Sequence, residues 1–244
     1  MNIIFLMGGG RADTNKEQYP LYMTEINEKT ILEQQFYNIQ KIQPQQLLFC
    51  VHEAEIKKFY LSSIIKQIDP TSIIIPIISQ TKGAICSALL AAEYIDNDSE
   101  LILMSIDDFM DEDCLQIVNK FRESNSDAGV VSFTSIHPRY SFVKTSNDGV
   151  LLEFSEKRPI SKNALVSFYY FKKGRDFVEC AKEVIRKDNF VQGNFYISQT
   201  LNEMILKQKK IDLYKIDNDK FHPLKTEQQM AEYLFEINEK MGSK

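Results

Sequence analysis

The sequence lacks any apolar run close to the roughly 20 residues that a bilayer-spanning helix needs. It also lacks a basic N-terminal segment, and its first apolar run is too short for the hydrophobic region of a signal peptide. We therefore expect a cytoplasmic protein that has no membrane partner.

Cysteine is scarce and scattered. The four cysteines form no pair with the spacing of a metal knuckle or a CxxC motif, and we expect free, mostly buried thiols at Cys50, Cys86, Cys114 and Cys180. Internal repeats, low-complexity segments and linkers rich in Pro, Gly or Ser are also absent. These absences favour a single domain over residues 1–244.

The chain has fewer basic residues than acidic residues. The chain has 29 Lys and Arg residues against 34 Asp and Glu residues, and its formal net charge of -5 argues against a nucleic-acid partner. Hydrophobic residues make up 43% of the 244 residues, which is enough for a sizeable core and argues against disorder.

The first chemical signal is an apolar run over residues 3–7 that stops at three glycines, residues 8–10. The run predicts a buried strand of a parallel sheet. Glycine lets the backbone approach a ligand closely, and N–H groups in such a turn can cradle phosphate oxygens. Arg11 and Lys16 would supply positive charge beside those phosphates. A tight turn explains the glycines equally well, because they match neither the phosphate-loop motif nor the dinucleotide fingerprint.

Strand and helix patterns alternate along the first half of the chain, which predicts an α/β sandwich around a mixed, mostly parallel sheet. The predicted strands cover residues 3–7, 47–51, 72–78, 100–106 and 127–134, and the predicted helices cover 29–41, 53–67, 83–94 and 112–122. In the second half we predict a hairpin of 140–144 and 150–155 around Asn147-Asp148-Gly149, strands 165–171 and 211–216, and helices 175–186, 194–208 and 226–240.

Two adjacent carboxylates, Asp107 and Asp108, follow the predicted strand 100–106. Ligands of such sheets bind outside the carboxyl ends of the strands, so these carboxylates and the glycine loop share one edge. A hard cation relieves the repulsion between two carboxylates, and Mg²⁺ takes one or two of them together with phosphate oxygens. The alternative is a helix cap, which we favour less because Asp111 and Asp113 are available for capping.

A second loop-to-helix junction reads Thr81-Lys82-Gly83-Ala84. Gly83 would let a flat base approach the backbone, and the helix N-terminus would face the ligand. An ordinary junction without a ligand explains the segment equally well.

In order and spacing, these segments resemble the sugar-nucleotide nucleotidyltransferase family over nearly the whole chain. The resemblance is carried by Gly-Gly-Gly-Arg at 8–11, Lys16, Pro20-Leu21, Glu-Ile-Asn-Glu-Lys at 25–29, Thr-Lys-Gly-Ala at 81–84, Ser-Ile-Asp at 105–107 and Glu-Lys-Arg-Pro at 156–159. The branch linked to capsular polysaccharide gene clusters resembles the chain further at residues 168–174, 194–198 and 220–224.

The resemblance implies a Rossmann-like, three-layer nucleotidyltransferase fold of the GT-A-like type, with a nucleotide-binding half (1–135) and an acceptor-binding half (136–244). It implies a Mg²⁺-dependent transfer from a nucleoside triphosphate, with CTP favoured, to a phosphorylated small molecule, with release of pyrophosphate. The acceptor would be a sugar 1-phosphate or a phosphocholine-like or phosphoglutamine-like compound, used in capsule or surface polysaccharide biosynthesis. A homodimer is a further possibility.

The same resemblance implies which residues form the site. Arg11 and Lys16 would stabilise the leaving pyrophosphate, and Lys157 would orient the attacking phosphate. The nucleotide-binding residues would be Met7, Gly8, Gly9, Gly10, Arg11, Gln80, Thr81, Gly83, Ser105 and Asp107. The acceptor-binding residues would be Asp108, Glu156, Lys157, Ser167 and Asn194, and the metal ligands Asp107 and His222.

Several positions depart from the family pattern. The family's Lys-Pro-Leu reads Tyr-Pro-Leu at 19–21, which leaves Lys16 as the candidate lysine. Where a second metal carboxylate is usual, the chain reads His-Pro-Leu-Lys-Thr at 222–226. His222 is either a replacement ligand or a structural histidine packed before Pro223. Ser167 stands where a glycine is usual.

Two other functions are compatible with these residues. A glycosyltransferase of related architecture would use Asp107 and Asp108 with a metal to hold a nucleotide-sugar and would release a nucleoside diphosphate. A non-catalytic nucleotide-binding module would explain the missing lysine and the missing second carboxylate.

Overall fold

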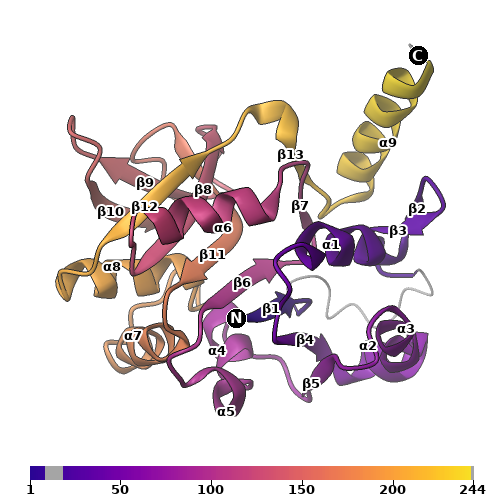
Figure 1. Ribbon diagram of the computed structural model, residues 1–244, viewed down its shortest axis with the longest axis horizontal. Coiled ribbons are helices and arrows are strands. Elements are labelled where there is room, and N and C mark those ends of the chain that lie inside the picture. Colours follow the sequence, from indigo (N-terminus) through magenta and orange to yellow (C-terminus); the bar gives the residue numbers. More distant parts are fainter. Residues whose placement is uncertain (9–18, 243–244) are drawn as a thin grey trace.

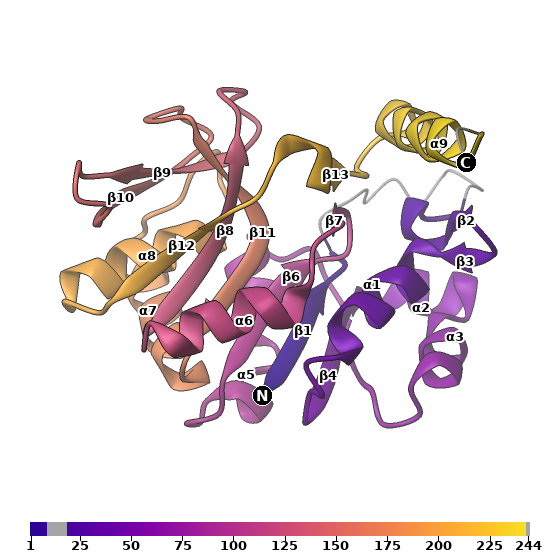
Figure 2. The same cartoon turned by 45° about the horizontal axis from the view of Figure 1, so that its top comes forward.

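The computed structural model describes residues 1–8 and 19–242, and the side chains of residues 238 and 240–242 are outside that description (Figure 1). One large mixed sheet runs through the molecule, and helices lie on both of its faces (Figure 2). The predicted fold class, an α/β three-layer sandwich, is confirmed.

The N-terminal half of the sheet is parallel. Its strand order is β5 (Ile73–Ile77), β4 (Gln46–His52), β1 (Asn2–Leu6) and β6 (Leu101–Ser105). All four strands therefore end at the same edge, and the loops that leave them carry the candidate residues of the nucleotide side.

The second half of the sheet begins at β11 (Asn163–Phe171), which runs antiparallel to β6. Beyond it, β8 (Ala128–Thr134) is antiparallel to β11, and β12 (Ile211–Lys215) is parallel to β8. The predicted hairpin is formed by β9 (Ser141–Thr145) and β10 (Leu151–Glu156), and β9 joins β11 at Ala164. Of the acceptor-side candidates, Ser167 thus lies on the strand next to β6, whereas Glu156 ends β10, which β9 and β11 separate from β6.

Alternation along the buried strands produces the two cores. In β1, Ile3 and Phe5 face one layer of helices and Ile4 faces the other. The first layer contains α1 (Ile31–Gln40), α2 (Glu53–Phe59), α3 (Leu61–Ile68) and α6 (Cys114–Glu123). The second contains α4 (Ala84–Leu89), α5 (Ala92–Ile95), α7 (Gly174–Arg186) and α8 (Ile197–Leu206).

Smaller elements complete the carboxyl edge of the sheet. A two-stranded ribbon is formed by β7 (Asp108–Met110) and β13 (Phe221–Pro223), and α9 (Glu227–Gly242) packs beside it (Figure 1). The remaining elements are β2 (Glu25–Ile26), β3 (Lys29–Thr30) and two 3₁₀ turns, η1 (Leu21–Met23) and η2 (Asn218–Lys220).

The predicted elements occur, with several differences. The helix predicted over 29–41 begins only at Ile31, after β3, and the helix predicted over 194–208 begins only at Ile197; β2 and the two 3₁₀ turns were not predicted. The helix predicted over 53–67 is divided at Tyr60, whose left-handed backbone (φ 53°) interrupts the helix. The helix predicted over 83–94 is divided between Leu89 and Ala92 into α4 and α5. The β7–β13 ribbon was not predicted, because strands of three residues leave no periodic pattern.

The cysteines are free thiols, as predicted, and Cys86 alone among them is only half-buried. In the part of the chain that the structure describes, no helix combines the length and apolar character that crossing a membrane requires.

Candidate active site

The strand ends of the parallel half lie in mutual contact. His52 Nε2 lies 3.2 Å from the carbonyl oxygen of Gly8, and Met7 N donates to Cys50 O at 3.0 Å. A Cβ added at Gly8 would lie 2.8 Å from Ile77 Cδ1, so the first turn after β1 passes close to the end of β5. Met7 is buried in the core, and its N–H already bonds to Cys50 O.

Four of the predicted residues, Gly9, Gly10, Arg11 and Lys16, lie outside the described residues. Of the remaining nucleotide-side candidates, Gln80 is exposed, and Thr81 Oγ1 lies 2.7 Å from Ser87 Oγ.

Gly83 joins the nucleotide side to the segment before α8. Its φ of 100° favours glycine, and an added Cβ would lie 2.5 Å from the carbonyl oxygen of Phe195 and 3.1 Å from Asn194 Cβ. Phe195 N also donates to Lys82 O at 2.8 Å. The close backbone approach of residue 195 is thus a structural reason for glycine at position 83, and it brings Asn194 beside the predicted nucleotide-binding loop.

Asp107 and Asp108 follow β6, and their backbone is held by a buried amide. Gln35 Nε2 on α1 donates to Ile106 O at 3.2 Å and to Asp108 O at 3.0 Å. Leu224 N donates to Asp107 O at 2.7 Å, so the segment after β13 continues the ribbon alongside the carboxylates. The backbone of this dipeptide is therefore fixed from two sides.

The side chain of Asp108 is buried and connects three parts of the chain. Its Oδ1 lies 2.9 Å from Lys225 Nζ, and its Oδ2 accepts a hydrogen bond from Ser167 N at 3.3 Å. Ser167 lies where the register of β11 against β8 shifts between Leu165 and Tyr169. Asp108 and Ser167, both predicted on the acceptor side, are brought together.

Asp107 lies in a region of excess negative charge. Burial raises its pKa to about 7, Lys225 opposes that shift, and Asp108 and Glu55 add to it. Burial also raises the pKa of Glu55, which accepts a hydrogen bond from Tyr22 Oη at 2.8 Å. Asp107 thus has two other carboxyl groups and one ammonium group within electrostatic reach, an arrangement that favours a further cation at Asp107.

Glu156 ends β10 and is held by two hydroxyl groups. Ser198 Oγ donates to Glu156 Oε2 at 2.8 Å, and Ser141 Oγ donates to the same oxygen. Burial raises the pKa of Glu156, whereas the two serines and the charges of Lys157 and Lys225 act in the opposite direction. The Glu156 carboxylate is therefore fixed in position on the acceptor side.

Lys157 follows Glu156 with a left-handed backbone (φ 55°). Its Nζ donates to Gln192 Oε1 at 3.0 Å and lies 5.0 Å from the centroid of the Tyr196 ring. Asn194 Nδ2 donates to Gln192 O at 3.2 Å. Lys157 and Asn194, both predicted to bind the acceptor, therefore converge on Gln192.

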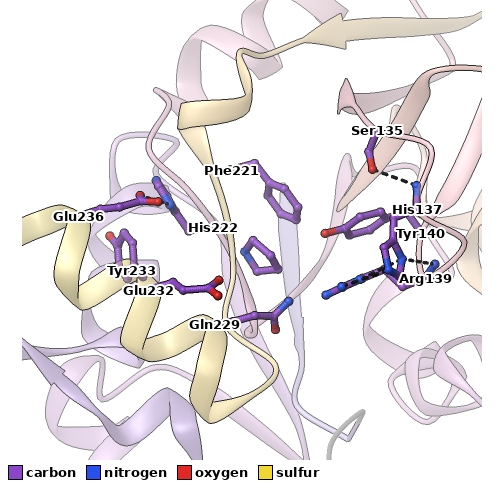
Figure 3. Close-up of a pocket in the computed structure, with 11 residues that line it drawn as sticks. Ser135, His137, Arg139, Tyr140, Phe221, His222, Gln229, Glu232, Tyr233 and Glu236 are labelled. Atoms are coloured by element: carbon purple, nitrogen blue, oxygen red, sulfur yellow. Dashed lines mark hydrogen bonds and ion pairs between the residues drawn. The ribbon is translucent and has the colours of Figure 1, made fainter.

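His222 contacts α9. Its imidazole is 4.4 Å, centroid to centroid, from the ring of Tyr233, and its Nδ1 lies 3.6 Å from Glu236 Oε2 (Figure 3). The side chain is 8% exposed. These contacts favour the packed structural histidine over the metal ligand. Within residues 1–8 and 19–242, no three His, Cys, Asp or Glu side chains gather closely enough to hold a metal ion.

A cavity of about 280 Å³ lies between residues 135–140, β13 and α9. Gln229 and Glu232 of α9 and Tyr140 of the opposite wall point into it (Figure 3). The charges of Asp108 and Lys225 act on the pKa of Tyr140, so this wall borders the carboxylate pair. The cavity is lined by Ser135, His137, Arg139, Tyr140, Phe221, His222, Pro223, Gln229, Glu232, Tyr233 and Glu236.

Several residues of this region were not predicted from the sequence. Gln35 was visible as a polar residue on the apolar stripe of its helix, a pattern that often marks a buried hydrogen bond. Lys225 was visible within residues 222–226, but only the β7–β13 pairing shows that it reaches Asp108. Tyr22 and Glu55 gave no signal in the sequence.

Comparison with solved structures supports the fold. A nucleoside-diphosphate-sugar pyrophosphorylase from Vibrio cholerae RC9 superposes with a TM-score of 0.79 at 20% identity, covering 96% of this chain and 99% of that chain. A UDP-glucose pyrophosphorylase complexed with UDP-glucose gives 0.76 at 15% identity, covering 98% of each chain. HddC from Yersinia pseudotuberculosis complexed with GMP-PN gives 0.65 at 15% identity, covering 97% of this chain and 99% of that chain.

No family model and no curated protein matches the sequence. At identities of 20% and below, the structural likeness establishes the architecture of the chain, and its chemistry must be argued from its own residues.

The role of Gln35 can be tested by Gln35→Ala. The substitution leaves two buried carbonyl oxygens without their amide donor, so we expect the free energy of unfolding to fall by about 2 kcal/mol. Gln40→Ala, at an exposed position of the same helix, is the matched control and should change it by less than about 0.5 kcal/mol. Urea denaturation measures both, and equal values for the two variants would refute the assigned role.

Gly83→Ala tests the close approach of Phe195. Gly193 also has a positive φ (78°), but an added Cβ there meets no atom within 4 Å. Gly193→Ala should therefore lower the free energy of unfolding only by the backbone penalty, about 1 kcal/mol. Gly83→Ala should lower it by at least about 2 kcal/mol more, because its Cβ overlaps a backbone carbonyl. A similar loss in both variants contradicts the contact.

The raised pKa of Glu156 predicts a pH dependence of stability. Between pH 4.5, the usual pKa of a glutamate, and the raised pKa of Glu156, the folded protein holds a proton that the unfolded chain has released. The free energy of unfolding therefore falls as the pH rises through this range. Glu156→Gln removes this titration. The stability of wild type relative to that variant should decline as pH rises from about 4 upward in chemical denaturation. A difference that does not vary with pH would show that the folded pKa is not raised.

Proposed function

We propose that the protein is a nucleotidyltransferase that joins a nucleoside triphosphate to a phosphorylated small molecule and releases pyrophosphate. The observation that carries this proposal is the contact between the two predicted substrate sides. A Cβ added at Gly83 would lie 3.1 Å from Asn194 Cβ, and Asp107 is followed directly by Asp108, which accepts a hydrogen bond from Ser167 N and pairs with Lys225. The fold shared with two pyrophosphorylases adds support.

The proposed reaction is an in-line substitution at the α-phosphorus. An oxygen of the acceptor phosphate forms the new P–O bond while the bond between the α-phosphorus and the bridging oxygen to the β-phosphate breaks. The electron pair leaves with pyrophosphate, and no proton has to be transferred for the bonds to balance. The protein contributes positioning and neutralisation of charge rather than a covalent intermediate.

We assign Mg²⁺ to Asp107. The fit rests on the donor chemistry: a carboxylate whose charge is disfavoured by burial and by Asp108 and Glu55 gains from a bound divalent cation. Mg²⁺ commonly takes one or two carboxylates and completes its shell with water and phosphate oxygens, so Asp107 suffices as a single protein ligand. When bound, the ion would supply charge neutralisation at the phosphates.

The remaining roles follow the two sides of the site. Arg11 and Lys16 would hold the triphosphate, and residues 80–83 would lie against the base. Glu156, whose carboxylate is fixed by two serines, would bind the organic part of the acceptor together with Asn194 and Ser167. Lys157 would bind its phosphate after leaving Gln192.

For the substrates, we propose CTP as the triphosphate and either a sugar 1-phosphate or a small non-sugar phosphate as the acceptor. The motifs at 168–174, 194–198 and 220–224, which resemble the capsule-linked branch, support this choice and a place in capsule or surface polysaccharide biosynthesis.

A pyrophosphate-release screen tests the proposal. The purified protein is incubated with Mg²⁺ and each of four triphosphates, crossed with a panel of sugar and non-sugar phosphates. Pyrophosphate formed in equal amount to a coupled product supports the transfer. Release of nucleoside diphosphate from a nucleotide-sugar would instead identify a glycosyltransferase, and tight triphosphate binding without turnover would identify a binding module.

Asp107→Asn tests the assigned carboxylate. The substitution keeps the size of the side chain and removes its charge, so we expect loss of most activity, about 100-fold or more in kcat, with the fold intact. Asp111→Asn is the matched control, since Asp111 is a 64% exposed carboxylate four residues away and should keep activity within about twofold. Wild-type turnover by the Asp107→Asn protein would overturn the metal assignment.

A further inference from the structure

The β7–β13 ribbon carries a lysine into the proposed transfer site. Pro223 pairs with Asp108 in the ladder, and Leu224 N donates to Asp107 O at 2.7 Å. The next residue, Lys225, therefore leaves the ribbon directly beside the carboxylate pair. Gln229 Oε1 on α9 accepts a hydrogen bond from Lys225 N at 3.0 Å, so its backbone is held from the other side as well.

The ion pair that Lys225 makes is asymmetric. The side chain of Asp108 is 2% exposed, whereas that of Lys225 is 45% exposed, and Nζ lies 2.9 Å from Oδ1. The contact is an ion pair, and a lysine ammonium carries three N–H donors that can bond to a ligand. The buried carboxylate thus anchors one side of the ammonium while the side chain remains open to a ligand.

Lys225 acts on carboxyl groups of both predicted substrate sides. Leu224 N donates to Asp107 O, which places residue 225 beside the nucleotide side, and the partner of Lys225, Asp108, accepts a hydrogen bond from Ser167 N on the acceptor side. The charge of Lys225 also opposes the rise in the pKa of Glu156 that burial causes. The same charge opposes the rise in the pKa of Tyr140 that burial causes. Lys225 therefore lies within electrostatic reach of the nucleotide side and of the acceptor side at once.

The other lysine near Glu156 is engaged elsewhere. Lys157 Nζ donates to Gln192 Oε1 and lies over the Tyr196 ring. A phosphate dianion that entered between Asp107 and Glu156 would meet carboxylates on both sides. Without an ammonium at this point, the repulsion would oppose binding of the acceptor.

We propose that Lys225 is a catalytic residue that binds the acceptor phosphate between Asp107 and Glu156 together with Lys157, while Asp108 holds the ammonium of Lys225 in place. This inference rests on the proposed function for the identity of the ligand. It gives the buried Asp108 a defined purpose, since a lysine fixed by a neighbouring carboxylate needs little reorganisation when the phosphate arrives.

The competing explanation is that Lys225 only neutralises Asp108. Lys225→Met alone does not separate the two explanations, because it leaves a buried carboxylate unpaired and destabilises the fold. The double variant Asp108→Asn/Lys225→Met removes both charges together. If Lys225 only neutralises Asp108, the double variant should have wild-type kinetics. If Lys225 binds the acceptor phosphate, the double variant lacks that ligand and should remain impaired.

The experiment measures initial rates against acceptor and triphosphate concentration for wild type and the double variant. We expect the double variant to fold, its KM for the acceptor to rise about tenfold or more, and its kcat to fall about tenfold to a hundredfold. The KM for the triphosphate should change by less than about threefold. Lys220→Met, at a 40% exposed lysine of the same segment, is the control and should stay within twofold of wild type. Wild-type kinetics in the double variant would overturn the proposal.

A second measurement keeps this inference separate from the proposed function. Inorganic phosphate is titrated into each protein and followed by ³¹P NMR, which requires no turnover. We expect wild type to bind phosphate about tenfold more tightly than the double variant, and Lys220→Met to match wild type. Equal binding by wild type and the double variant, or no binding by wild type, overturns the role of Lys225. If the wild-type binding is as expected but no substrate pair yields pyrophosphate, the proposed function fails and Lys225 remains a phosphate ligand.

Discussion

The site depends on one electrostatic constraint: two adjacent carboxylates stand at the end of a buried strand and need positive charge nearby. Burial disfavours the charged form of Asp107, and Asp108 beside it adds repulsion. Lys225 supplies this positive charge, because the β7–β13 ribbon brings its Nζ to within 2.9 Å of Asp108 Oδ1. Gln35 holds the backbone of the same turn, so the position of the carboxylates is fixed before any ligand binds.

The ion pair of Asp108 and Lys225 also connects the two halves of the chain. Through Ser167 N, Asp108 bonds to β11, the strand at which the sheet changes from parallel to antiparallel. Glu156 responds to the charge of the same lysine. Two anionic substrates can react at such a contact between the halves, because each of them needs positive charge nearby. The carboxylates fix the positions of the groups that carry this charge.

The sequence predicts the architecture well and the site less completely. The strands of the parallel half are continuous apolar runs, and burial on both faces makes such runs easy to recognise. The reason for glycine at position 83 lies in the backbone of Phe195, a contact between distant segments that leaves no local pattern. The ribbon that delivers Lys225 consists of three-residue strands whose pairing is purely tertiary. Local sequence patterns therefore predict where the strands end. Which side chains come together at those ends depends on pairing between distant segments, which the sequence does not reveal.

The most direct test of this account is a crystal structure of the protein with Mg²⁺, a non-hydrolysable triphosphate analogue and a phosphorylated acceptor. The account predicts the metal and the α-phosphate at Asp107, with the acceptor phosphate on Lys225. A triphosphate bound elsewhere, for example in the cavity between Tyr140 and Tyr233, would contradict it.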